Sequence, residues 1–168
     1  MTVKYFPKAV NKQTLINKIV VKLIAELEGS TKAAQLAHAE ATHEQSKAEN
    51  KYDTRGLEAS YLAHGQARQA RELEAAISAF KNMDARSYAA GEPIGVGALV
   101  ELEHDDEKSY YFLATRAGGM EVKHDKRAVL VITPQSPMGE QLQGKTQGNL
   151  LQLSLGGALK QYRVVKVS

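Results

Sequence analysis

Hydrophobic residues in the first half of the chain follow a helical spacing. Residues 10 to 83 contain no proline and are rich in alanine, glutamate, glutamine and lysine, which all favour helix. Ile16, Val20, Leu23 and Leu27 are separated by 4, 3 and 4 positions, as in the apolar seam of a heptad repeat. This pattern predicts a long amphipathic helix near the start of the chain.

A short polar break separates this helix from a second one. Residues 47 to 56 read KAENKYDTRG, and Asp53 or Thr54 can serve as the N-cap of a helix extending from residue 57 to about residue 80. Two long helices joined by such a turn predict an antiparallel coiled-coil hairpin. Beyond Leu27 the seam is mostly alanine, so we expect a thin rod that reaches toward something rather than encloses a site.

After residue 90 the pattern changes to short apolar runs punctuated by glycine and proline. We expect strands over residues 97–103, 109–115, 120–123, 128–133, 149–155 and 159–167, and a short helix over 137–143. Gly156-Gly157 predicts a hairpin between the last two strands, and the wholly apolar run AVLVIT predicts a buried central strand. The fold class is therefore α+β: a hairpin domain over 1–85 with an acidic tip near 47–56, then a mostly antiparallel β domain with one short helix over 86–168.

Composition removes several classes of function. The 168 residues are 43% hydrophobic and 24% charged, which is too apolar for a disordered chain and too charged for a membrane protein. There is no cysteine, which excludes disulfides and cysteine nucleophiles. The net charge of +3 does not form a strongly basic block. We expect a cytoplasmic protein with no membrane partner, no secretory signal and no small-molecule substrate.

The second half carries a more specific pattern than its periodicity. Residues 132 to 153 read ITPQSPMGEQLQGKTQGNLLQL. The series Ser136-Pro137-Met138-Gly139, then Gly144-Lys145 and Gly148, closely resembles the Gre family of bacterial transcript-cleavage factors. In that family a long antiparallel coiled coil precedes an FKBP-like β domain, so the resemblance covers most of the chain.

The resemblance implies a mechanism and a partner. In the Gre family the β domain docks on RNA polymerase, and the segment Ser136 to Gly139 is expected to contribute to that docking here. The coiled coil enters the secondary channel of the polymerase, where tip acids help hold a second Mg²⁺ that is shared with the polymerase active site. Backtracked RNA is then cleaved near its nascent 3′ end. Such a protein is an accessory factor, not an enzyme.

The expected metal-holding and catalytic residues are Glu49 and Asp53. The usual tip of the family reads Asp-Leu-Lys-Glu-Asn, and the matching stretch here begins at Glu49. Lys51 matches, whereas Tyr52 occupies the position of the second acid and Asp53 follows one step later. The alternative interpretation is that Asp53 caps the second helix and Glu49 is a solvated charge.

Basic and aromatic residues surround these acids. Lys47, Lys51 and Arg55 are candidates for contact with the displaced RNA end, or they balance the charge of the tip in solvent. Tyr61 could stack on a base, although at helical spacing from Leu57 it more often packs on the partner helix.

Two other functional classes stay open. The first is a Gre-fold regulator that occupies the secondary channel without promoting cleavage, and the second is a coiled-coil interaction protein unrelated to transcription. The histidines are too scattered to predict a metal site, and Ser136 has no evident base partner. Prolyl isomerisation needs an aromatic-lined pocket, which 3 Phe and no Trp do not favour.

Overall fold

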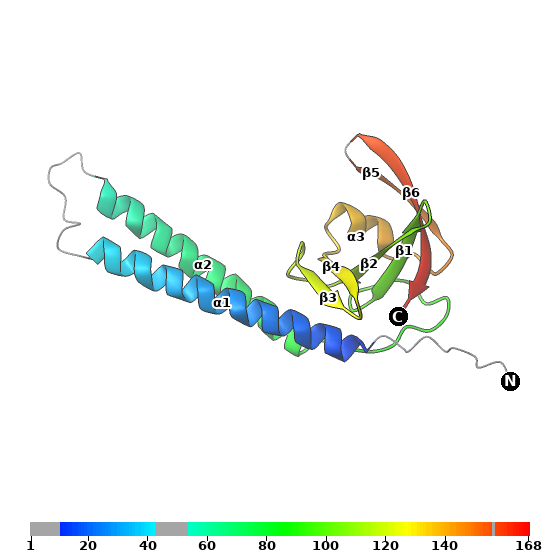
Figure 1. Ribbon diagram of the computed structural model, residues 1–168, viewed down its shortest axis with the longest axis horizontal. Helices are drawn as coiled ribbons and strands as arrows, with labels where there is room; N and C mark the ends of the chain where they lie inside the picture. Colours follow the sequence, from blue (N-terminus) through cyan, green and yellow to red (C-terminus); the bar gives the residue numbers. More distant parts are fainter. Residues whose placement is uncertain (1–10, 43–53, 156) are drawn as a thin grey trace. The chain divides into compact units, whose positions relative to one another are not determined.

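The computed structural model describes residues 11–42, 54–155 and 157–168 (Figure 1). By its contacts the chain divides into two units. One is helical and spans Ile19–Lys81, and the other combines the chain up to Lys18 with Asn82–Ser168. The first turns of the first helix therefore group with the β domain. The functional boundaries 1–85 and 86–168 stay a prediction.

Two long helices form the hairpin. Helix α1 spans Lys12–Thr42 and helix α2 spans Arg55–Lys81, and they run side by side in opposite directions (Figure 1). Asn11 caps the start of α1, because its side-chain oxygen accepts the Thr14 backbone N–H at 3.2 Å. The buried apolar positions of the helical unit are Ile19, Leu23, Ala37, Ala76, Ile77 and Phe80. The predicted helical hairpin is confirmed.

The second half folds as one six-stranded sheet. Its strands are β1 (Leu99–His104), β2 (Glu107–Leu113), β3 (Glu121–His124), β4 (Arg127–Ile132), β5 (Leu150–Leu155) and β6 (Ala158–Val167). Their order is β3-β4-β2-β1-β6-β5, and every neighbouring pair is antiparallel except β2 with β4. The predicted mostly antiparallel β domain with one short helix is confirmed.

Two tight turns set the register of two hairpins. Asp105 and Asp106 join β1 to β2 with φ of 48° and 63°, and Asp125 and Lys126 join β3 to β4 with φ of 49° and 63°. Two consecutive residues with positive φ make a type I′ turn, whose twist matches that of the flanking strands. Aspartate tolerates this left-handed backbone better than most residues, so the acidic turn has a structural role.

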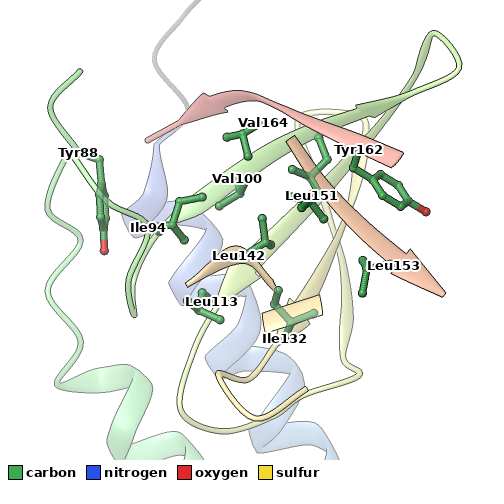
Figure 2. Close-up of a cluster of buried hydrophobic side chains, with 12 residues drawn as sticks. Tyr88, Ile94, Val100, Leu113, Ile132, Leu142, Leu151, Leu153, Tyr162 and Val164 are labelled. Atoms are coloured by element: carbon green, nitrogen blue, oxygen red, sulfur yellow. The ribbon is translucent and has the colours of Figure 1, made fainter. Parts of the chain in front are cut away.

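One large apolar cluster lies within the core of the β unit. It gathers side chains from β1, β2, β4, β5, β6, helix α3 (Pro137–Leu142) and the segment before β1 (Figure 2). Leu142 of α3 is fully buried among these side chains, beside Leu151 and Leu153 of β5 in the same cluster. Helix α3 therefore closes the core.

A buried lysine ties the first turn of α1 to the β unit. Lys12 is only 5% exposed, and its ammonium donates to the Gly97 carbonyl at 3.0 Å. The same ammonium lies 4.8 Å from the centre of the Tyr88 ring, and the Arg86 guanidinium lies 4.1 Å from the same ring centre. Burial, together with the nearby positive charge of Arg86, lowers the pKa of Lys12 to about 8. The backbone oxygen and the ring face compensate the buried charge.

Candidate functional sites

The turn between β4 and α3 is held by a serine that bonds in both directions. The Ser136 hydroxyl donates to the Thr133 carbonyl at 2.8 Å and accepts the Gly139 backbone N–H at 3.1 Å. Ser136 is thus the N-cap of α3, and Pro137 follows at the first helical position, where its missing N–H costs nothing. The Ser-Pro pair of the sequence motif therefore defines the helix start.

The glycine of the same motif is required by space. A Cβ atom built on Gly139 would lie 1.9 Å from the Thr133 carbonyl oxygen and 2.8 Å from its carbon. Real Cβ atoms do not approach backbone so closely, so any larger residue would displace α3 from the end of β4. Gly139 is itself buried.

The end of α3 is tied to the segment before β1. The Gly144 N–H donates to the Ile94 carbonyl at 2.9 Å, and the Ile94 N–H donates to the Lys145 carbonyl at 2.7 Å. Gly144 has φ of +78°, which glycine adopts without strain. The Gly-Lys part of the motif therefore holds the chain that leaves α3 against the segment before β1 through two backbone hydrogen bonds.

The four residues predicted to bind polymerase differ in what they offer a partner. Pro137 is exposed, whereas Ser136 is half-buried and Gly139 is buried. Met138 is half-buried and packs against the core cluster. A partner approaching this turn meets the side chain of Pro137 first.

The predicted metal and RNA contacts lie mostly outside the described residues. These are the candidate ligands Glu49 and Asp53 and the candidate RNA contacts Lys47 and Lys51. Tyr52, which occupies the position of the second acid, also lies outside the described residues. Arg55 is the first residue of α2. The roles of all these residues stay predictions. Among the residues that the structure does describe, no three His, Asp or Glu side chains gather as metal ligands would.

The start of α2 is defined by a threonine. Thr54 directly precedes the helix, its carbonyl accepts the Glu58 N–H at 2.9 Å, and its hydroxyl donates to the Glu58 carboxylate at 3.0 Å. Of the two N-cap candidates in the sequence, Thr54 holds the position next to the helix.

The half of the hairpin toward the tip has small residues between its helices and large ones outside. A groove of about 890 Å³ between α1 and α2 is lined partly by Ala34, Ala63, Ala67 and Ala70. Tyr61 is 69% exposed, so the interpretation that it packs on the partner helix is wrong. Leu57 and Leu62 are also largely exposed. The ring of Tyr61 is free for stacking, as the other interpretation required.

A buried histidine in the β unit escaped the sequence analysis. His124 ends β3, is 3% exposed, and neither ring nitrogen has a hydrogen-bond partner among the described residues. Burial is the largest influence and lowers the pKa of His124, while the carboxylate of Asp125, 3.4 Å from Nε2, opposes the shift. Lys18 and Arg127 lower it further. Its place before a turn gave no sign of burial.

The solved structures similar to this chain include transcription factors. GreA factor homolog 1 (Gfh1) of Thermus thermophilus is 26% identical over 89% of this chain and 94% of that chain, with a TM-score of 0.38. Gfh1 of Thermus aquaticus is 28% identical, with coverages of 87% and 91% and a TM-score of 0.40. The elongation factor GreA/GreB from Nitrosomonas europaea is 18% identical, with coverages of 67% and 92% and a TM-score of 0.38.

Comparisons of the sequence alone find less. No protein-family model matches this chain, and no curated protein matches it. No helix within the described residues is long and apolar enough to cross a membrane.

Replacing Gly139 by alanine tests the close approach at the motif. We expect Gly139→Ala to lower the free energy of unfolding of the β unit by about 2 to 4 kcal/mol, because the new Cβ would force the backbone apart. Gly65→Ala in α2 is the matched control, since nothing lies within 4 Å of its Cβ position. That change should stabilise the helix by about 1 kcal/mol. Urea denaturation measures both, and equal effects would refute the steric argument.

The buried His124 predicts a dependence of stability on pH. The folded state keeps a lowered pKa, whereas the unfolded chain binds a proton near pH 6.5. The unfolded state therefore binds more protons below that pH, and the free energy of unfolding falls as the pH drops from 7 to 5, by at most about 1.4 kcal/mol per pH unit.

Urea denaturation at pH 7, 6 and 5, followed by the near-ultraviolet signal of the tyrosines, measures this slope. His124→Leu should flatten it, while the same change at the exposed His64 should not. A slope that is identical in the wild-type chain and His124→Leu would contradict the assignment.

Proposed function

We propose that this protein is a Gre-like accessory factor that binds bacterial RNA polymerase, enters its secondary channel with the hairpin, and stimulates cleavage of backtracked RNA. The observation that carries the proposal is the turn from Thr133 to Gly139. Its serine cap, its proline at the first helical position and its sterically required glycine account for three of the four residues in the motif. Those constraints support a fold built around the motif rather than a chance match.

The proposed docking surface includes the exposed part of this turn. Gln135, Pro137 and Glu140 are exposed, while the rest of the turn is committed to capping and packing. A partner that recognises this surface would read the rigid shape of a proline-started helix together with a few polar groups. The rigidity lowers the entropy that binding would cost.

The proposed role of the hairpin tip rests on the chemistry of its side chains. Carboxylates are the ligands that Mg²⁺ prefers, and Mg²⁺ rarely needs a full protein cage. Glu49 and Asp53 would together hold the ion with the polymerase, where it would stabilise charge on the oxygens of the scissile phosphate. Thr54 directly precedes α2, and its carbonyl accepts the Glu58 N–H. In this proposal the protein has no nuclease activity alone.

One sequence feature favours a second candidate. Tyr52 stands where the family's second tip acid is expected. A phenol is a poor ligand for a hard divalent cation at neutral pH, because it stays protonated. If the shift to Asp53 does not restore the second ligand, the protein would occupy the channel as a regulator without promoting cleavage.

A charge placed on the docking turn should weaken polymerase binding. Pro137→Glu introduces a carboxylate, which is favourable in the first turn of a helix, so α3 should still form. We expect affinity for purified RNA polymerase to fall at least about tenfold, because an unpaired charge would enter the contact.

The control carries the same charge change elsewhere. Gln161 is exposed on β6, and Gln161→Glu should bind like the wild-type chain. Biolayer interferometry with immobilised polymerase gives both affinities. If Pro137→Glu is folded and binds unchanged, the docking surface lies elsewhere.

Changing both tip acids should separate binding from cleavage. Glu49→Gln with Asp53→Asn keeps size and polarity but removes the charge that Mg²⁺ requires. We expect stimulated cleavage in stalled, backtracked complexes to be lost while polymerase binding changes less than about twofold. Raising Mg²⁺ should partly rescue each single variant by mass action.

The outcome with the wild-type chain distinguishes the two candidates. Binding with cleavage supports the first, whereas binding without cleavage at any Mg²⁺ concentration supports the non-cleaving regulator. If the protein does not bind polymerase, both candidates are refuted, and a coiled-coil interaction protein unrelated to transcription is then the favoured class.

A further inference from the structure

The two edges of the sheet are built differently. Strand β3 closes one edge with only four residues, and its exposed positions Glu121 and Lys123 are charged. Strand β5 closes the other edge with six residues, LLQLSL, which carry no charge and no proline. Short length, charge and proline are the usual means by which proteins keep an edge strand from pairing with another chain. Strand β5 has none of them.

The backbone of β5 offers unpaired groups at alternate residues. The Val164 N–H donates to the Asn149 carbonyl at 2.9 Å, and the Val164 carbonyl accepts the Gly148 N–H at 2.8 Å, so both backbone groups of Val164 face this strand at a bulge. Bonded and non-bonded pairs alternate along an antiparallel ladder, and Leu155 opposite Ala158 follows the same alternation at the two-residue loop. The N–H and C=O groups of Leu150, Gln152 and Ser154 therefore point away from β6, toward the open edge.

The same strand is complementary to itself. If a second β5 runs antiparallel with Gln152 opposite its own copy, Leu150 lies opposite Ser154, and Leu151 lies opposite Leu153. The three bonded pairs would exchange about six ladder hydrogen bonds, and no like charges would meet. Leu151 and Leu153 already line the core face of the sheet, and Leu150 is 54% exposed on the other face.

From this geometry we infer that β5 pairs with β5 of a second copy of this chain, about a two-fold axis at Gln152, to form one sheet across both copies. The occupant is a second copy because the strand is uncharged, and under two-fold symmetry about Gln152 the apolar Leu151 and Leu153 oppose each other in both directions. A single pair of short strands is a small interface, so the dimer is concentration-dependent. The inference does not depend on the proposed function, because it concerns the protein without polymerase.

The chain's lack of cysteine allows a direct test. In the inferred dimer the two residues at position 152 have Cα atoms about 5.5 Å apart, which is within the range of a disulfide. We expect Gln152→Cys to form a cross-linked dimer under mild oxidation, at least tenfold faster than Gln161→Cys. Gln161 is the matched control because it is exposed and lies opposite Gln152 on β6. Its two copies would lie about 15 Å apart, one strand spacing further in on each side.

Sedimentation velocity of the unmodified chain between 10 and 500 µM provides the second arm. The wild-type chain should show a dimer fraction that rises with concentration, and Gln152→Pro should remove it. The N–H of residue 152 faces the open edge, so proline there removes a ladder donor without breaking a bond to β6; circular dichroism checks that the variant is folded.

Three outcomes would overturn the inference. The first is a wild-type chain that stays monomeric up to 500 µM, and the second is equal cross-linking by the two cysteine variants. The third is a monomeric chain in which Gln152→Pro abolishes polymerase binding, because the edge would then receive a strand from a different protein.

Discussion

The β unit depends on the contact of one backbone with another, at Gly139 against the Thr133 carbonyl. This approach leaves no room for a Cβ atom, and it sets where α3 lies after β4 ends. Helix α3 in turn places Leu142 in the core beside the inner leucines of β5. The chain leaving α3 then bonds to Ile94, in the segment that leads into β1. Through α3, Gly139 thus links the end of β4 to the packing of β5 and to the segment that leads into β1.

Local patterns were sufficient to predict the elements of this fold. Strands alternate or run apolar according to whether one or both faces are covered, and turns carry residues that tolerate positive φ, such as Asp105 and Gly157. The short helix expected over 137–143 is started by capping chemistry that is local, since the Ser136 hydroxyl accepts a backbone N–H three residues later. The start of α1 at Asn11 follows from the same chemistry.

Long-range contacts were not predictable in the same way. Lys12 is buried because a carbonyl 85 positions away and the ring of Tyr88 meet it in the fold. Neither partner has a spacing that the sequence alone could relate to Lys12. His124 was missed for a similar reason, since a residue beside a turn is usually exposed and only tertiary packing covers this one. Of the candidate site, the sequence predicted the residues of the turn but not which of them stay accessible.

The hairpin reverses the usual distribution of large and small apolar residues. Toward its tip, alanines line part of the groove between the helices, while Leu36, Leu57, Tyr61 and Leu62 are exposed. Exposed large apolar side chains on a soluble protein often mark a surface that meets a partner, and small residues at the seam keep the two helices thin. Under the proposed function, a narrow cross-section would let the hairpin enter a channel, and these exposed side chains would gain from burial there. The large buried side chains of the helical unit, among them Leu23, Ile77 and Phe80, lie at the other end of the hairpin, so most of its apolar packing between large side chains is there.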